Sequence, residues 1–286
     1  MSQIVKLVRT FARCCSLVVC AAKRTKGSEV VVLMYHRVVG DSGLELDIDA
    51  EVFRRQLEWL KKNCWVISLD SLVDGELLNC KDEQGLDKPK VVLTFDDAYL
   101  DFYEFVWPLL KSMQLPATLY APTGYLENPS EVPLSDKSSV NKHLLPVSWA
   151  MLEELHRCPL ITIGAHSHSH REFPSLSSAE IQNELITSDA YFEKYLGYKP
   201  KHFAYPRGAW DEASQGALGE RYQSHTLVSG GVVDLARLNP RELPRVPVLR
   251  SDGFFWFKQR VWGRLALEEK LFGVLRKRFQ RRRAGY

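Results

Sequence analysis

Residues 89–97 read PKVVLTFDD. The run 89–95 is short, apolar and rich in β-branched residues, which predicts a buried strand that ends at two aspartates. Further runs of this kind are VVVLMY at 30–35, LITIG at 160–164 and HFAYP at 202–206. Helical periods separate them, as at 50–63 and 178–196. The alternation predicts an α/β fold, a mainly parallel sheet covered by helices, either open or closed into a barrel.

The composition is that of a folded globular protein. Of 286 residues, 45% are hydrophobic and 26% are charged, which excludes a disordered chain or a disulfide-dense miniprotein. The length suits one α/β barrel domain, since these run to about 250 residues. The six cysteines form no Cys-x-x-Cys pair, which argues against a zinc ribbon and favours a reducing compartment.

Polar clusters follow the predicted strands where chemistry is expected in such folds, at their carboxyl ends. His36 follows the first strand, Asp96 and Asp97 follow the second, and Pro206-Arg-Gly208 follows a later one. Because neighbouring residues of a strand point to opposite faces, the two aspartates are expected to serve different roles.

Three histidines stand within five residues, His166-Ser-His168-Ser-His170. Imidazole is the commonest nitrogen ligand of zinc and similar ions. On one turn of helix the first and fifth residues share a face, so His166 and His170 are expected to converge on a metal while His168 points elsewhere. One aspartate would complete the site and the other could act as a base, which predicts hydrolysis of an amide or ester. The alternative is a polar loop with chance histidines.

Three ordered motifs resemble those of the polysaccharide deacetylases, the NodB-homology or carbohydrate esterase family 4 group. They are TFDDA at 94–98 for the usual TFDDG, HSHSH at 166–170 for H-[ST]-x-x-H, and FAYPRG at 203–208 for FAYPxG. The resemblance runs from about Val30 to about Gly253. It implies a distorted (β/α) barrel and metal-dependent removal of an N-acetyl or other small acyl group from an amino sugar.

The resemblance also implies roles. The metal ligands would be Asp97, His166 and His170, holding zinc, with cobalt, nickel or manganese as alternatives. Asp96 would take a proton from the attacking water. The backbone N–H of Arg207 would help bind the oxyanion, which needs no particular side chain. Tyr205 and Pro206 of the third motif would contact the substrate.

Two departures from the family pattern matter. Ala204 stands where an arginine often orients the catalytic aspartate, and we expect Arg245 of LPRVPV to replace it and to lie at the substrate site. The usual late catalytic histidine is missing. A permuted branch places it early, in a strand ending Tyr-His, which Met34-Tyr-His36 resembles. We therefore assign His36 as the general acid, with a strand-end cap as the alternative reading.

Weaker candidates remain. His202 and His225 could also supply the acid. Trp149 could line the sugar groove or pack in the core, and the sequence leaves both open.

The net charge of +3 is unevenly spread. Residues 1–26 carry six basic residues and no acid, and residues 258–286 carry ten against two glutamates, which leaves −11 on residues 27–257. We expect a basic N-terminal segment at 1–28, the deacetylase domain at 29–253 and a basic amphipathic C-terminal helix and tail at 254–286.

The two ends of the chain indicate the expected cellular location. Ile4, Val8, Phe11, Cys15 and Val18 fit one helix face, and the apolar run at 14–22 is shorter than the about twenty residues of a membrane span. An amphipathic surface helix is favoured over a cleaved secretory signal. Basic apolar ends suit an anionic membrane surface, whereas the acidic body argues against nucleic acid. We expect a cytoplasmic protein peripheral to the inner membrane, with a secreted or periplasmic one as the alternative.

The sequence therefore predicts a metal-dependent hydrolase that deacylates an amino-sugar polysaccharide, oligosaccharide or glycolipid. Two alternatives remain. One is a non-catalytic carbohydrate-binding protein on the same fold. The other is a metal-dependent phosphoesterase, which would want more carboxylates and a phosphate-binding loop.

Overall fold

A computed structural model describes residues 3–20, 22, 25–76, 88–129, 145–219, 221–271 and 273. Its strands are β1 (Glu29–Tyr35), β2 (Trp65–Ile67), β3 (Lys90–Phe95), β4 (Ala117–Ala121), β5 (Ile161–Ala165), β6 (His202–Ala204), β7 (Ser224–Leu227), β8 (Val233–Asp234), β9 (Leu243–Pro244) and β10 (Val246–Pro247). Its α-helices are α1 (Gln3–Val19), α2 (Ala50–Asn63), α3 (Leu69–Asp74), α4 (Trp107–Met113), α5 (Thr123–Glu127), α6 (Trp149–His156), α7 (Ser178–Leu196), α8 (Glu212–Leu218) and α9 (Gly253–Val261).

The strands form one sheet that almost closes on itself. Their order is β10-β1-β3-β4-β5-β6-β7-β9, with β2 paired to β3 and β8 to β1. These pairs are parallel except that between β1 and β8. The two outermost strands, β9 and β10, are separated in the chain only by Arg245. The Arg245 N–H donates to the Leu227 carbonyl and the Val248 N–H to the Met34 carbonyl, both at 2.9 Å, so this short segment bridges the two edges. The predicted distorted barrel is confirmed.

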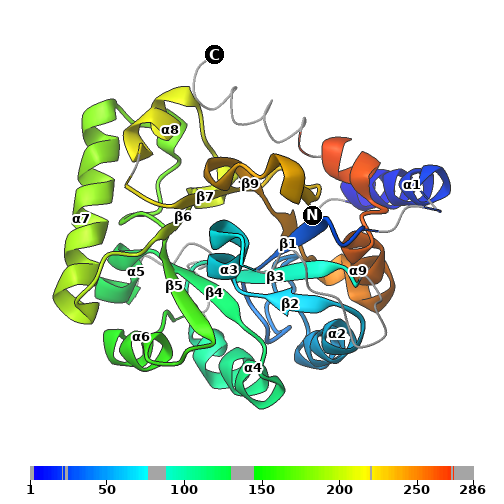
Figure 1. Ribbon diagram of the computed structural model, residues 1–286, viewed down its shortest axis with the longest axis horizontal. Coiled ribbons are helices and arrows are strands. Elements are labelled where there is room, and N and C mark those ends of the chain that lie inside the picture. Colours follow the sequence, from blue (N-terminus) through cyan, green and yellow to red (C-terminus); the bar gives the residue numbers. More distant parts are fainter. Residues whose placement is uncertain are drawn as a thin grey trace.

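Two apolar layers stabilise the barrel, as strand alternation requires. Inside, Val30 and Val32 of β1 pack with Leu69 and Leu72 of α3. Outside, the alternate residues of β1 pack in the larger cluster beneath the helices. Figure 1 shows α2, α4, α6, α7 and α8 around the sheet and α3 over its centre.

Local signals explain the longest helices. Asp49 accepts hydrogen bonds from the N–H groups of Glu51 and Val52 and so begins α2. Ser177 and Glu180 form a capping box at the start of α7, which ends at Gly197 with a φ of 73°. The predicted helices at 50–63 and 178–196 therefore match the structure.

Other elements differ from the prediction. The helix predicted from Tyr103 begins as a π-helical turn at Phe102–Val106 and becomes α-helical at Trp107, because Pro108 supplies no N–H and sits in the first turn of α4. The loop predicted at 122–146 contains α5, and its residues 130–144 lie outside the described part of the chain. The segments β2 and α3 were not predicted, since each is too short to show a period.

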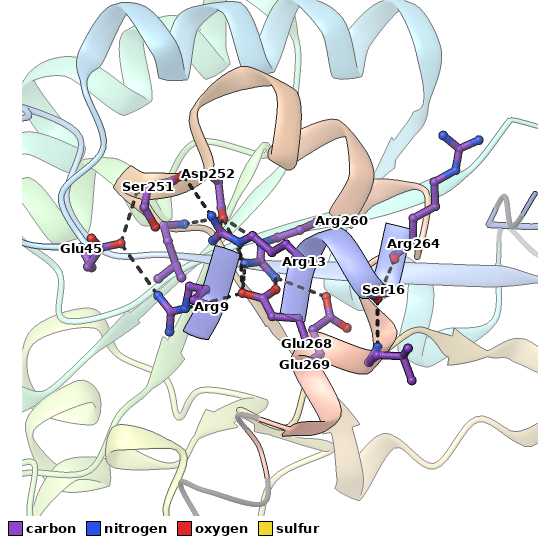
Figure 2. A network of polar contacts seen from close by, with 12 residues as sticks. Arg9, Arg13, Ser16, Glu45, Ser251, Asp252, Arg260, Arg264, Glu268 and Glu269 are labelled. Atoms are coloured by element: carbon purple, nitrogen blue, oxygen red, sulfur yellow. Dashed lines mark hydrogen bonds and ion pairs between the residues drawn. The ribbon is translucent and has the colours of Figure 1, made fainter. Parts of the chain in front are cut away.

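The two ends pack together. Arg13 of α1 is buried, and its guanidinium donates to Asp252, to Glu268 and to the Ser251 carbonyl (Figure 2). No helix among the described residues is long and apolar enough to cross a membrane. The boundaries at 28 and 254 stay predictions, and most of the predicted basic tail, residues 274–286, lies outside the described chain.

The end of the barrel opposite the motifs is closed by α3. Asp70 accepts hydrogen bonds from Thr162 Oγ1 at 2.6 Å, and its other oxygen lies 3.1 Å from His202 Nε2. His202 Nδ1 lies 2.8 Å from Ser224 Oγ. This Ser-His-Asp row is structural, because Ser224 and His202 are both fully buried and no substrate reaches the hydroxyl.

Replacing Asp70 should weaken the protein in a pH-dependent way. The hydrogen bond from His202, against the opposing effect of burial and with help from Thr162, lowers the pKa of Asp70 to about 2. A lowered folded-state pKa stabilises the protein above about pH 4 and loses that effect as the pH falls towards 2. Because a third of the side chain is exposed, we expect Asp70→Asn to cost about 1 kcal/mol at pH 6 and less at pH 3.

Urea unfolding at the two pH values measures this difference. Asp74→Asn at the exposed end of the same helix is the matched control and should show no such pH dependence. An Asp70→Asn penalty equal at both pH values would contradict the assignment.

The segments after the strands adopt unusual backbone conformations. Asp97, Ala98, Ser167, His170 and Arg207 all have φ between 48° and 72°. These residues cluster at the predicted site, where such strain is commonly tolerated. Ala98 stands where the first motif usually carries glycine, and its φ of 48° is one that glycine adopts without strain.

Ala98→Gly should therefore stabilise the protein. Glycine removes the strain of a left-handed alanine, and this effect exceeds the cost of the lost methyl contact and of the greater entropy of the unfolded chain. We therefore expect the free energy of unfolding to rise by about 0.5 kcal/mol. Ala121→Gly in β4, at an ordinary strand position, should instead cost about 1 kcal/mol. Chemical denaturation of both variants measures this difference in stability. Equal losses of stability in the two variants would contradict the inferred backbone strain at Ala98.

Candidate active site

Three buried side chains from two strand ends meet at one point. His170 Nε2 lies 3.3 Å from Asp97 Oδ1 and 3.2 Å from His166 Nε2, and His166 Nε2 lies 3.6 Å from Asp97 Oδ1. Asp97 follows β3, and the histidines follow β5. The structure thus brings together the three residues predicted as metal ligands, and together they could hold a metal ion.

The protonation state of His166 and His170 suits metal binding. His166 Nδ1 lies 2.7 Å from the Ala204 carbonyl, so this nitrogen carries the proton and Nε2 presents its lone pair to the other two residues. Burial lowers the pKa of His166, and burial together with His166 lowers that of His170 further. Both imidazoles are therefore neutral, as coordination requires.

The expected helical turn at the second motif is wrong. Residues 166–170 form a non-helical turn in which Ser167 and His170 have φ of 64° and 58°. The His170 N–H donates to Ser167 Oγ at 3.1 Å, which closes the turn. The two outer histidines still converge and His168 still points elsewhere, its Nδ1 lying 2.9 Å from Thr123 Oγ1.

The carboxylate of Asp97 is suited to binding a cation. Its Oδ1 is buried and has no hydrogen-bond partner among the described residues. Burial, and then the neighbouring Asp96 carboxylate, raises the pKa of Asp97 to about 8, against a hydrogen bond with Tyr99. The three distances between the ligand atoms are close to the separation of about 3.3 Å expected between two ligand atoms of a tetrahedral site, each 2.0–2.1 Å from zinc. A divalent ion here would satisfy the orphaned oxygen and favour its ionised form.

Asp96 belongs to a different interaction. Arg245 donates to its two oxygens at 2.5 and 2.7 Å, and the same guanidinium lies 3.2 Å from Thr94 Oγ1. Burial alone would raise the pKa of Asp96, but Arg245 and then His166 hold it at about 2. Arg245 thus lies where a replacement for the arginine absent at Ala204 was expected. It is fully buried, so the geometry places it behind the carboxylate and not at the surface offered to a substrate.

His36 lies at the end of β1, partly exposed, and is an electrostatic neighbour of both Asp96 and His170. The loop after it is anchored by a buried acid that the sequence did not reveal: Asp101 Oδ2 accepts the Val38 N–H at 2.6 Å. Burial raises the pKa of Asp101 to about 7. The role of His36 stays a prediction.

The third motif forms a tight turn beside the histidines. Arg207 has φ of 55°, and its exposed side chain lies 3.6 Å from Glu172. Its charge opposes the rise in the pKa of Asp97 and adds to burial and His166 in lowering the pKa of His170. Tyr205 and Pro206 are buried, so their side chains offer little surface to a glycan. Their predicted substrate contact and the oxyanion role of the Arg207 N–H remain predictions.

Trp149 belongs to an aromatic row that reaches the second motif. Its ring stacks on Tyr195 at 4.4 Å and lies parallel to Tyr191 at 6.3 Å, and Tyr191 stacks on His168 at 5.3 Å. The indole N–H donates to Glu127. Trp149 is partly buried, so it contributes to the packing of α6 on α7 while some of its surface faces solvent.

The weaker acid candidates lie elsewhere. His202 is at the opposite end of the barrel, in the row with Asp70. His225 lies in the layer beneath the helices, against Tyr205 and Tyr222. Both are fully buried, so neither can reach a substrate at the motif end.

One supporting residue escaped the sequence analysis. Glu184 of α7 accepts the N–H groups of His168 and Ser169 at 3.0 and 2.8 Å and so shapes the histidine turn. It stands on the apolar face of α7 beside Leu185, and a carboxylate on a buried helix face is the signal that could have identified it.

Relatives were found among proteins and among solved structures. The chain is 26% identical over 190 residues to YxkH of Bacillus subtilis (strain 168), covering 66% of this chain and 61% of that protein. It is 24% identical over 275 residues to the poly-beta-1,6-N-acetyl-D-glucosamine N-deacetylase of Escherichia coli (strain K12), covering 84% of this chain and 39% of the relative. It therefore spans less than two thirds of the length of either relative.

The fold is that of solved deacetylases. Streptococcus pyogenes deacetylase PplD matches with a TM-score of 0.65 and 20% identity, over 82% of this chain and 98% of that one. IcaB from Ammonifex degensii matches with a TM-score of 0.65 and 20% identity, over 84% and 99%. The family model for polysaccharide deacetylases matches residues 83–221. This segment contains all three motifs, so the predicted resemblance to the polysaccharide deacetylases is confirmed.

Proposed function

We propose that this protein is a metal-dependent hydrolase that removes the N-acetyl group from an amino-sugar glycan. The observation that carries the proposal is the pairing of the Asp97-His166-His170 cluster with a second carboxylate, Asp96, held ionised by Arg245. A sugar-binding protein needs no such set. A phosphoesterase would want further carboxylates at the cluster; among the described residues Asp96 lies 4.0 Å from His166, while Glu184 accepts the backbone N–H groups of the histidine turn.

Asp97, His166 and His170 would hold the metal. Two imidazoles and one carboxylate suit zinc, with cobalt, nickel and manganese as alternatives. When bound, a divalent ion would polarise the amide carbonyl and make a water molecule nucleophilic at neutral pH.

The protein's own groups would carry the protons. Ionised Asp96 accepts one proton as water attacks the carbonyl carbon and the new C–O bond forms. The Arg207 N–H donates to the oxygen that gains charge. As the C–N bond breaks, His36 donates a proton to the leaving nitrogen, which gives a carboxylic acid and a free amino sugar. Arg245 touches no reacting atom and positions Asp96.

The names of the relatives support a substrate class for the proposal. The Escherichia coli relative is named as acting on poly-β-1,6-N-acetyl-D-glucosamine. We propose N-acetylglucosamine oligomers as substrates, either as free glycans or linked to lipid. Acetate release from these oligomers, abolished by a chelator and restored by zinc, tests the activity; no acetate from β-1,6-linked oligomers with metal present would refute this substrate.

His166→Ala should lose the metal. Removing one of three ligands leaves two, and metal content measured by mass spectrometry should fall from about one ion per chain to background. His168→Ala is the matched control from the same motif, since its ring contacts Thr123 and Tyr191 and should leave the metal in place. Equal metal loss in both variants would contradict the ligand set.

Arg245→Lys should separate positioning from metal binding. Lysine keeps the charge but cannot donate two parallel hydrogen bonds to Asp96, so we expect kcat to fall by about 10–100-fold. The metal content and KM should hardly change, because Arg245 contacts neither the ligands nor the substrate. A rise in KM with kcat intact would instead make Arg245 a substrate-binding residue.

A further inference from the structure

The N-terminal helix α1 turns its charged side towards the protein. Arg13 is buried against Asp252 and Glu268. Arg9 reaches Glu268 at 3.5 Å and Glu45 at 3.9 Å. Figure 2 shows both arginines directed from α1 into this network, which the buried Arg260 completes. The contacts join α1 to the loop before α2 and to the segment around α9.

The opposite side of α1 is apolar and exposed. Leu7, Phe11, Val18 and Val19 are 73%, 71%, 79% and 71% exposed, and Val8 is 44% exposed. We call these five residues the α1 apolar face. A helix on a soluble protein ordinarily presents its polar side to water, so a contiguous exposed apolar stripe of this kind marks an interaction surface.

The helix cannot roll to bury this face. Rotation would take Arg9 and Arg13 away from Glu268 and Asp252 and leave buried carboxylates without their partners, which is strongly unfavourable. The polar network therefore fixes α1 with its apolar face outward.

A second exposed apolar pair lies on a helical segment that contacts α1. The Leu267 N–H donates to Ser16 Oγ at 3.1 Å, so the helical residues 266–271 begin beside α1. Leu267 and Leu271, one turn apart, are each 43% exposed.

The sequence segments that adjoin this surface are basic. Besides Arg9 and Arg13, which face the protein, residues 1–26 hold four Lys or Arg and no acid. Residues 274–286, which follow the helical turn with Leu271, hold six and no acid. A two-fold dimer through α1 would bring these like charges together, whereas an anionic bilayer is complementary to them.

We propose that α1, with Leu267 and Leu271, is a membrane-docking surface for anionic bilayers. The α1 apolar face enters the boundary between headgroups and acyl chains, with the helix lying in the plane of the membrane. The positive charge that these two segments carry in the sequence favours anionic headgroups. Docking requires no part of the proposed hydrolysis.

Co-sedimentation with vesicles tests the proposal. The full chain should bind vesicles of phosphatidylcholine with phosphatidylglycerol, should bind phosphatidylcholine alone much less, and should be released as salt rises. Phe11→Ser with Val18→Ser should lower partitioning by about tenfold or more, because two apolar side chains no longer leave water. Both positions are exposed, so the thermal melt should stay unchanged and show that the variant folds.

A matched control removes the same kinds of side chain elsewhere. Phe105→Ser with Ile186→Ser takes away residues 40% and 56% exposed, the latter on α7, across the barrel from α1 (Figure 1). This variant should bind like the unaltered protein. The proposal fails if the unaltered protein binds neither vesicle, or if the α1 variant and the control bind equally. A dimer that the α1 variant dissolves, with no vesicle binding, would assign the face to a second copy and overturn it.

Discussion

Two adjacent buried carboxylates dominate this structure. Asp96 and Asp97 are 3% and 2% exposed, and two ionised carboxylates so close together in a dry interior are unstable unless each has its own counter-charge. Arg245 supplies one through a two-pronged hydrogen-bonded ion pair. For the other, the structure offers two neutral imidazoles and an orphaned oxygen, an arrangement complete only with a cation.

That division gives the two acids opposite properties. The pKa of Asp96 is held at about 2, whereas burial and Asp96 raise the pKa of Asp97 to about 8 in the absence of an ion. The difference comes from geometry. Asp97 leaves the strand with φ of 72° and turns towards the histidines, while Asp96 faces Arg245 at the barrel seam. Asp96 is thereby kept ionised by Arg245, and Asp97 Oδ1 faces the two histidines.

The same physics acts at the chain ends. Arg13 and Arg260 are buried and face Asp252 and Glu268, so they attach α1 to the barrel and orient it. Because the charged side of α1 makes these contacts with the barrel, its apolar side remains exposed to water. Buried ion pairs of this kind contribute specificity of placement more than net stability.

The sequence alone was enough to predict the strand ends and the cluster of Asp97, His166 and His170. The motifs at 94–98, 166–170 and 203–208 named the residues that converge, and apolar runs ending in polar residues placed them on one rim of the barrel. The sequence did not predict the local backbone conformation of the histidine turn. This turn is not helical, because left-handed residues and Glu184 shape it. The sequence also could not fix the long-range partners. Only the closure of the sheet through Arg245, 149 residues from Asp96 in the chain, decided which acid is neutralised, because such a contact depends on how the two edges of the barrel meet.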